Sequence, residues 1–186
     1  MSIYRVKADI KKYQAFYLID DDENINLQVE GYFDFKGVPK IGEWKGARVY
    51  LDATYDNTKH ELPIADVTKF NVQALAYSEK AVKVLREILE ESGELLPFEC
   101  DGKKWWIHHI TNVVDALDPE STTMELMESG RFLIGKAALD ESKLSGTCMF
   151  KTKQRMGLIL GHNVPENDYQ TLVETSGLTG VLFSKK

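Results

Sequence analysis

The run LLPFECDGKKWWIHHI, residues 95–110, constrains the fold more than any other part of the chain. Asp101-Gly102 separates two strand-like segments, and an Asp-Gly pair in this setting is the strongest short signal for a two-residue β-hairpin turn. A two-residue turn fixes which residues face each other across the two strands. The expected pairs are Cys100–Lys103, Glu99–Lys104, Phe98–Trp105 and Leu96–Ile107. The apolar pairs share one face and the Glu–Lys pair lies on the other, so turn chemistry and cross-strand pairing predict the same register.

The segment SEKAVKVLREILEESG, directly before the hairpin, predicts a helix over residues 78–92. Ser78 is a typical N-cap, and Glu79 lies at the positive end of the helix dipole. Gly93 is expected to adopt the left-handed conformation that ends a helix. Apolar residues recur at helical spacing and form one stripe: Ala81, Val82, Leu85, Ile88 and Leu89.

Strand-like runs occupy much of the remaining chain. They lie within residues 3–19, 30–37, 47–55, 131–139 and 147–162, while 20–24 predicts a charged turn and 57–69 a connection. A second helix is expected over about 165–176: it starts at Pro165, buries Tyr169, Leu172 and Val173, and stops at Gly177 before a closing strand. The sequence therefore predicts one α+β domain over residues 1–186, with a mostly antiparallel sheet and two main helices. An alternative division of the same chain makes residues 1–64 a strand-rich N-terminal subdomain.

Composition limits the class of partner. The 186 residues are 43% apolar and 10% aromatic, which is typical of a folded chain. A formal charge of −6 argues against a nucleic-acid partner and suits a basic protein partner. Two cysteines are too few for a disulfide framework. The absence of a long apolar run predicts no signal peptide and no membrane-spanning helix, so the expected location is the cytoplasm.

Sequence signals for catalysis are weak. The segment GRFLIGKA, residues 130–137, has P-loop spacing, but it reads as a buried strand, and Ala137 stands where a Ser or Thr would hold Mg²⁺. Cys100 and His109 share a face of the hairpin yet lie roughly 20 Å apart, whereas a catalytic dyad needs about 3–4 Å. Cys148, His60 and His162 are isolated in sequence. We expect no catalytic, cofactor-binding or metal-binding residues and no enzymatic activity.

Two features are candidates for partner binding. The acidic run Asp20, Asp21, Asp22 and Glu23 is either a solvated turn or a docking patch for a basic partner. Trp106 falls on the hairpin face opposite Trp105. It either packs under another element or anchors a partner.

An ordered series of segments in the second half resembles a known family. The series is ESGELLPFEC (91–100), ITNVVDALDPESTT (110–123), TCMFKTK (147–153) and PENDYQTLVETSGLTGVLF (165–183). In order and spacing it is similar to immunity proteins of bacterial polymorphic toxin systems, specifically immunity family eleven, formerly a domain of unknown function. The resemblance covers roughly residues 65–183, and the first 60 residues match only in their strand-rich character.

The resemblance implies an inhibitor that binds a cognate toxin stoichiometrically in the cytoplasm and participates in interbacterial competition. It also implies that the final helix and strand belong to the domain. The negative charge suits a toxin with a basic cleft. Two alternatives remain open: a small-molecule-binding or regulatory module, and a hydrolase or metal enzyme whose residues meet only in the fold. Neither the toxin's identity nor homo-oligomerisation follows from the sequence.

Overall fold

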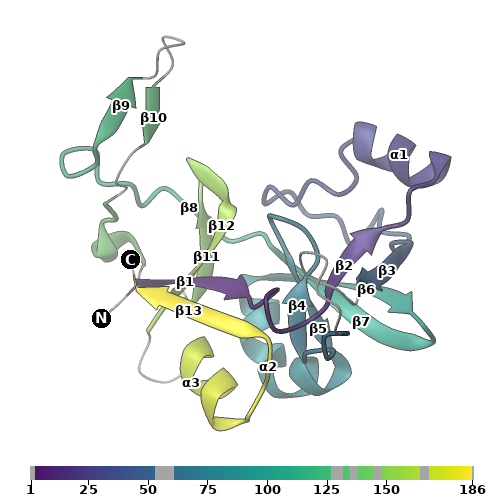
Figure 1. Ribbon diagram of the computed structural model, residues 1–186. Helices are drawn as coiled ribbons and strands as arrows, with labels where there is room; N and C mark the ends of the chain where they lie inside the picture. The colour runs from purple at the N-terminus through teal and green to yellow at the C-terminus, as the bar shows by residue number, and fades with distance from the viewer. Residues whose placement is uncertain are drawn as a thin grey trace.

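The structure is a computed structural model that describes residues 3–52, 61–126, 132–134, 138–144, 148–163 and 168–185. Mostly antiparallel sheets carry helices on their faces, which confirms the α+β fold class (Figure 1). The elements in chain order are β1 (Ile3–Ala8), β2 (Ala15–Leu18), α1 (Asp22–Val29), β3 (Val49–Asp52), β4 (Val67–Lys69), β5 (Leu75–Ser78), α2 (Glu79–Ser92), β6 (Gly93–Cys100), β7 (Lys103–Ile110), β8 (Val113–Val114), β9 (Met124–Leu126), β10 (Phe132–Ile134), the 3₁₀ helix η1 (Glu141–Leu144), β11 (Met149–Thr152), β12 (Arg155–His162), α3 (Tyr169–Thr175) and β13 (Val181–Lys185).

Two larger sheets form the body of the protein. One has the strand order β13-β1-β12-β11-β8 and the other β4-β5-β7-β6. The first strand of the chain therefore lies between two of the last, and β6 is an edge strand. Smaller two-stranded pairs, β2-β3 and β9-β10, complete the described sheets, and the β9-β10 pair projects from the body (Figure 1).

The predicted hairpin register is confirmed. β6 and β7 pair antiparallel with Cys100 opposite Lys103 and with all the expected pairs above it. Asp101 and Gly102 have φ values of 51° and 70°, the two positive values that this turn requires. The 132–134 segment forms strand β10, as expected for a run that reads as a strand rather than a phosphate-binding loop.

Helix α2 matches its prediction at the start and differs at the end. The Ser78 hydroxyl accepts a hydrogen bond from the Ala81 amide at 3.2 Å, and the whole predicted apolar stripe is buried. Gly93 does not adopt the left-handed conformation, because its φ of 174° is extended and β6 begins at this residue. A Cβ at Gly93 would lie 2.2 Å from the His109 carbonyl oxygen. The glycine is needed for this close approach rather than for a helix stop.

Other expectations for local structure were wrong. Residues 22–29 form helix α1 rather than part of a charged turn, residues 30–37 form turns rather than a strand, and the 57–69 connection contains β4. The predicted helix start at Pro165 lies outside the described residues; α3 begins at Tyr169, with Asp168 as its N-cap. Its end agrees with the prediction, since Gly177 follows with a φ of 65°.

Two apolar clusters lie on opposite faces of the four-stranded sheet. One lies under α2 and α3 and includes Tyr77 and Tyr169, whose hydroxyl oxygens are 3.0 Å apart. The other contains Phe98 and Trp105 and is covered by residues from the α1–β3 region. The second cluster gives the α1–β3 region its apolar support, and it lies beside the groove described next.

Candidate functional site

The acidic run begins helix α1. The Asp21 carboxylate accepts a hydrogen bond from the Asn24 amide at 2.9 Å, which makes it the N-cap. Asn24 is buried, and its side-chain amide donates to the carbonyl oxygens of Ile19 at 2.7 Å and Arg48 at 2.9 Å. The bond to Arg48 joins residues 24 apart in sequence and holds α1 against the start of β3.

Part of the acidic charge is neutralised within the fold. The Arg48 guanidinium lies 3.1 Å from Asp21 and 2.9 Å from Glu23. Asp20 and Asp22 are exposed, and within the described chain neither is recorded in an ion pair. The predicted patch thus divides into two carboxylates with a structural role and two that face solvent.

A groove of about 860 Å³ lies between α1, residues 44–48 and the β6–β7 hairpin. Glu23 and Trp106, both predicted to bind a partner, line this groove although 83 positions separate them. Its charged walls hold residues of both signs, and its aromatic surface comes from three elements. The aromatic and charged lining residues are Tyr32, Trp44, Phe98, Trp106, Lys45, Arg48, Lys104, Glu23 and Glu99.

The two tryptophans of the groove are held in different ways. Trp106 is half-buried and packs against the cluster under α2, as one of its two predicted roles requires. Trp44 stacks on Tyr32 with ring centroids 5.0 Å apart, and its Nε1 donates to the Pro97 carbonyl at 2.7 Å. Pro97 lies on edge strand β6, so the indole covers a backbone acceptor that another chain would otherwise meet. Contacts within the chain therefore fix the position of the aromatic wall.

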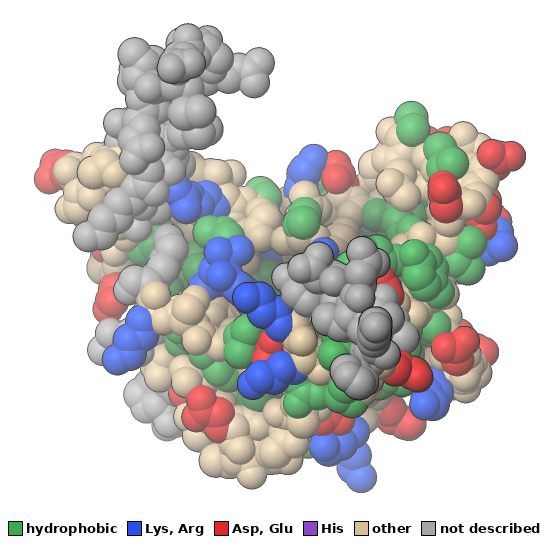
Figure 2. Space-filling model, in the orientation of Figure 1, with side chains coloured by type: hydrophobic (Ala, Val, Ile, Leu, Met, Phe, Trp, Pro, Cys, Tyr) green, Lys and Arg blue, Asp and Glu red, His purple; other side chains and the backbone are tan. Residues whose placement is uncertain are grey.

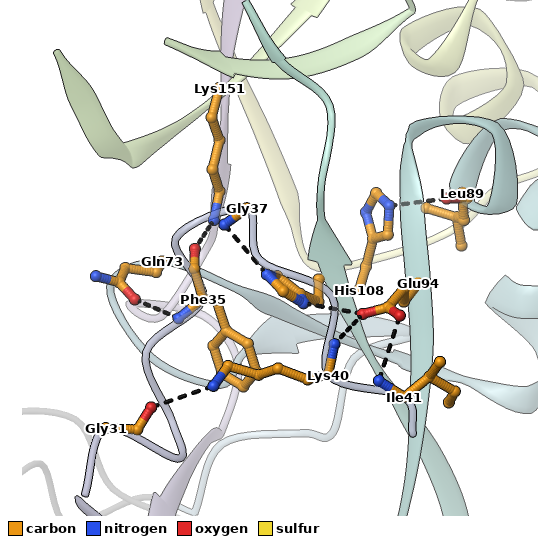
Figure 3. Close-up of polar contacts among 11 residues, drawn as sticks. Gly31, Phe35, Gly37, Lys40, Ile41, Gln73, Leu89, Glu94, His108 and Lys151 are labelled. Atoms are coloured by element: carbon orange, nitrogen blue, oxygen red, sulfur yellow. Dashed lines mark hydrogen bonds and ion pairs between the residues drawn. The ribbon is translucent and has the colours of Figure 1, made fainter. Parts of the chain in front are cut away.

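Residues 31–46, which carry Trp44, are fixed by side chains from the sheets (Figure 3). The Glu94 carboxylate of β6 accepts hydrogen bonds from the backbone amides of Lys40 at 2.8 Å and Ile41 at 3.2 Å. The His109 ring of β7 lies between Glu94, 3.2 Å from Nδ1, and the Gly37 amide, 3.3 Å from Nε2. An amide can only donate, so Nε2 accepts and Nδ1 carries the proton toward Glu94.

Burial keeps this histidine neutral. The pKa of His109 is lowered to about 4, first by desolvation and then by the nearby Lys151 ammonium, while Glu94 opposes the shift. His108 points to the opposite face, where its Nε2 lies 3.0 Å from the Leu89 carbonyl oxygen, and burial lowers its pKa to about 3. The two histidines thus serve separate faces, as the alternation of a strand requires.

Lys151 is the most unusual charged residue of the network. It is fully buried on β11, and its Nζ donates to the Phe35 carbonyl oxygen at 2.5 Å. Burial lowers the pKa of this amine to about 8. The contact joins the five-stranded sheet to residues 31–46, so both large sheets contribute to the position of the groove wall.

The described cysteines have little nucleophilic character. Burial raises the pKa of Cys148 to about 11, with a smaller contribution from Asp168, and burial followed by the Asp101 charge raises the pKa of Cys100. His162 is buried, and neither of its ring nitrogens has a hydrogen-bond partner in the described structure. His60 lies outside the described residues. Within those that are described, no group of three or more His, Cys, Asp or Glu residues is placed to hold a metal ion.

Comparison with known proteins assigns no family. No family model matches the chain, and no curated protein is significantly similar to it. None of the helices in the described segments is long and apolar enough to span a bilayer.

Proposed function

We propose that this chain is a cytoplasmic immunity protein that binds a cognate toxin stoichiometrically and neutralises it, with the groove between α1 and the β6–β7 hairpin as the principal contact. The proposal is supported by the resemblance to immunity family eleven. The observation that carries it furthest is the meeting of Glu23 and Trp106 in one groove. Aromatic side chains with charged neighbours are typical of the energetically dominant centre of a protein interface.

The groove wall is suited to binding a partner with little rearrangement. Trp44 is fixed by Tyr32 and Pro97, and the segment that carries it is fixed by Glu94 and His109. A surface ordered in advance loses less conformational entropy on association, which favours tight inhibition.

The primary test is neutralisation and capture. The full chain, used as bait in cells that make its neighbouring gene products, should recover one protein in stoichiometric amount. Expression of that protein's toxic domain should stop growth, and co-expression of this chain should restore it. Capture of no partner under these conditions, or a captured domain whose toxicity this chain does not relieve, contradicts the proposal.

The groove itself is tested by charge reversal at exposed lining residues. Lys45→Glu with Lys104→Glu should weaken toxin binding by about 10-fold or more, since each altered side chain lies in the groove. Lys83→Glu on α2 with Lys185→Glu on β13 makes the same charge change at exposed positions away from the groove and should bind as the parent does. Equal affinity for both double variants would remove the groove from the interface.

The exposed part of the acidic run gives a separate kinetic test. Asp20→Lys with Asp22→Lys should slow association and reduce its salt dependence if the toxin surface is basic. Both residues are exposed, and the capping carboxylate of Asp21 is untouched. Unchanged association kinetics at low salt would show that this run does not steer the toxin.

A small-molecule-binding module is the second candidate, and one observation favours it. The groove volume of about 860 Å³ lies within the roughly 300–1,000 Å³ typical of small-ligand sites. If this second candidate is correct, at least one compound in a thermal-shift screen of aromatic metabolites should raise the melting temperature of the protein. A small-molecule role would be favoured over the immunity role if a ligand stabilised the parent chain but not the Lys104→Glu variant, and if the chain also captured no protein.

A further inference from the structure

A second groove, of about 240 Å³, lies where β1 passes beside β4 and β12. Three basic side chains line it: Arg5 and Lys7 from β1, and Lys69 from the end of β4. Figure 2 shows Lys and Arg side chains gathered near the middle of the face in view, over β1. The groove is therefore locally positive, although the formal net charge of the protein is −6.

Among the described residues, these three cations form none of the ion pairs that other basic residues of the fold form. Lys12, Arg48 and Lys80 each lie within 3.8 Å of a carboxylate oxygen. By contrast, the described part of the chain contains no ion pair to any of the three groove cations, and no acidic side chain is among the groove's described lining residues. Like charges held together without countercharges repel one another, so the groove favours an incoming anion.

The Lys69 ammonium is positioned by an aromatic ring rather than a carboxylate. Its Nζ lies 5.8 Å from the centroid of the Tyr17 ring, within the range of a cation–π contact. Such a contact leaves the formal charge available to a ligand. Lys69 is also half-buried, which reduces the number of positions that its ammonium can occupy.

Size and floor chemistry limit what can enter. A volume of about 240 Å³ is below the roughly 300 Å³ at which small-molecule sites begin, so the groove suits one or two side chains rather than a nucleotide. Leu75 and Ile159 supply apolar floor, and the exposed side chain of Val72 lies at the groove. The cations match the carboxylate of an acidic side chain, and the apolar floor matches its methylene groups and an apolar neighbouring residue. A free inorganic anion has no apolar part to contact this floor.

We infer that this groove binds a glutamate-bearing segment of the protein partner, with Arg5, Lys7 and Lys69 as the residues that bind its carboxylates. The inference rests on the proposed function and adds a second contact, of opposite charge preference to the acidic run on α1. A toxin with a basic region facing α1 and an acidic segment facing β1 would bind in one orientation only. The reverse orientation would place like charges against each other.

Backbone-amide NMR of the full chain tests the groove without the toxin. The probe is a capped peptide, acetyl-Ala-Leu-Glu-Glu-Leu-Ala-amide, with a glutamine-for-glutamate peptide as its matched control and inorganic phosphate at equal ionic strength as the free anion. We expect saturable shifts of the amides of residues 5–8 and 69–71 with the acidic peptide at millimolar concentration. The glutamine peptide and phosphate should not saturate these amides in the same range.

Variants then assign the carboxylate partners. Lys7→Gln and Lys69→Gln should each weaken acidic-peptide binding by roughly 2–5-fold, the range for a partly exposed charge pair, while Lys83→Gln on the exposed face of α2 should not. Shifts confined to other surfaces, no shift at all, equal effects of Lys83→Gln, or phosphate binding as strong as peptide binding would each overturn the inference. The readout contains no toxin, so its failure leaves the neutralisation test standing, and failed neutralisation leaves the peptide result standing.

Discussion

Replacing Glu94 with Gln should loosen the wall of the α1 groove while preserving side-chain volume. The parent carboxylate accepts from the Lys40 amide at 2.8 Å, the Ile41 amide at 3.2 Å and the protonated Nδ1 of His109 at 3.2 Å. A glutamine offers one oxygen to these donors, and its NH₂ group must face at least one of them. The NH₂ group replaces either Oε2, which accepts from Lys40 and His109, or Oε1, which accepts from Ile41. At least one hydrogen bond is therefore lost, and the others lose their charge assistance.

The expected loss follows from the burial of each partner. The bond to Lys40 is partly buried and should be worth about 1.5–3 kcal/mol, because its acceptor is charged. The bond to Ile41 is exposed and adds about 0.5–1 kcal/mol. The glutamine oxygen is expected at the Oε2 position, where two donors converge, so the bond to Ile41 is lost and the bond to Lys40 falls to the roughly 0.5–1.5 kcal/mol of an uncharged pair. We therefore expect the free energy of unfolding to fall by about 1–3 kcal/mol, out of a typical total of about 5–15 kcal/mol, so the variant should still fold.

Urea denaturation measures the global loss, and amide hydrogen exchange locates it. With a denaturant slope of about 2 kcal/mol/M, the urea midpoint should fall by about 0.5–1.5 M. Exchange at Gly37, Lys40 and Ile41 should accelerate more than exchange in α2, since these amides depend directly on the network.

Glu99→Gln is the matched control for this prediction. It makes the same change of charge on the same strand, but at an exposed position opposite Lys104. It should alter the free energy of unfolding by less than about 0.5 kcal/mol. If Glu94→Gln costs no more than this control, or if the three loop amides exchange at the parent rate, the carboxylate does not hold the groove wall and the reasoning is refuted.

Three other perturbations test separate parts of the fold. Gly93→Ala should destabilise by about 2–3 kcal/mol or prevent folding, because its Cβ would lie 2.2 Å from the His109 carbonyl oxygen; a urea midpoint equal to the parent's would contradict this. His108 and His109 have folded pKa values of about 3 and about 4, so the unfolded chain binds more protons below pH 6.5. The stability that they contribute is complete above pH 6.5 and should fall by about 2 kcal/mol per histidine by pH 5, measured as urea midpoints across this range; a flat profile would count against neutral buried rings. Asp21→Ala should cost about 1 kcal/mol through loss of the α1 cap, and melting of the α1 amides before the rest of the protein in temperature-dependent NMR would be its signature; a parent-like urea midpoint would contradict the capping role.

The parts of the fold that sequence predicted well are those whose signals are local. The hairpin was predictable because Asp101-Gly102 sets the register by itself, and apolar pairs on both sides agree with it. Helix α2 was predictable because a cap and a continuous apolar stripe lie within 16 residues. Both interpretations needed no knowledge of any distant contact.

Helix α1 was missed because its stability depends on residues far along the chain. Its apolar periodicity is weak, and its buried residue is Asn24, whose side chain binds the Arg48 carbonyl. An acidic run followed by a polar residue resembles a solvated turn until that partner is known. The N-cap pattern at Asp21 was the available signal, since an Asp three residues before Asn24 can cap a helix.

Residues 30–37 were expected to form a strand for a related reason. Phe33 and Phe35 suggest strand alternation, and both side chains are indeed buried in the cluster beside the four-stranded sheet. Their backbone, however, binds side chains: the Phe35 amide donates to Gln73 at 2.7 Å, and its carbonyl accepts from Lys151. Aromatic alternation correctly indicated burial and could not indicate whether strands or side chains would satisfy the backbone.

The groove wall depends on side chains that form hydrogen bonds with the backbone of residues 31–46. This dependence explains why Lys151 is buried in β11. A buried ammonium is unfavourable unless it is well partnered, and a methionine at position 151 would fill similar space without that penalty. A methionine would also leave the Phe35 carbonyl without its donor, in a segment that has no strand ladder to replace it. Lys151 therefore fixes the position of residues 31–46 at some cost in the free energy of unfolding, and this is the exchange that the buried lysine represents. That exchange fits the proposed function, in which Trp44 is to be in place before a partner binds.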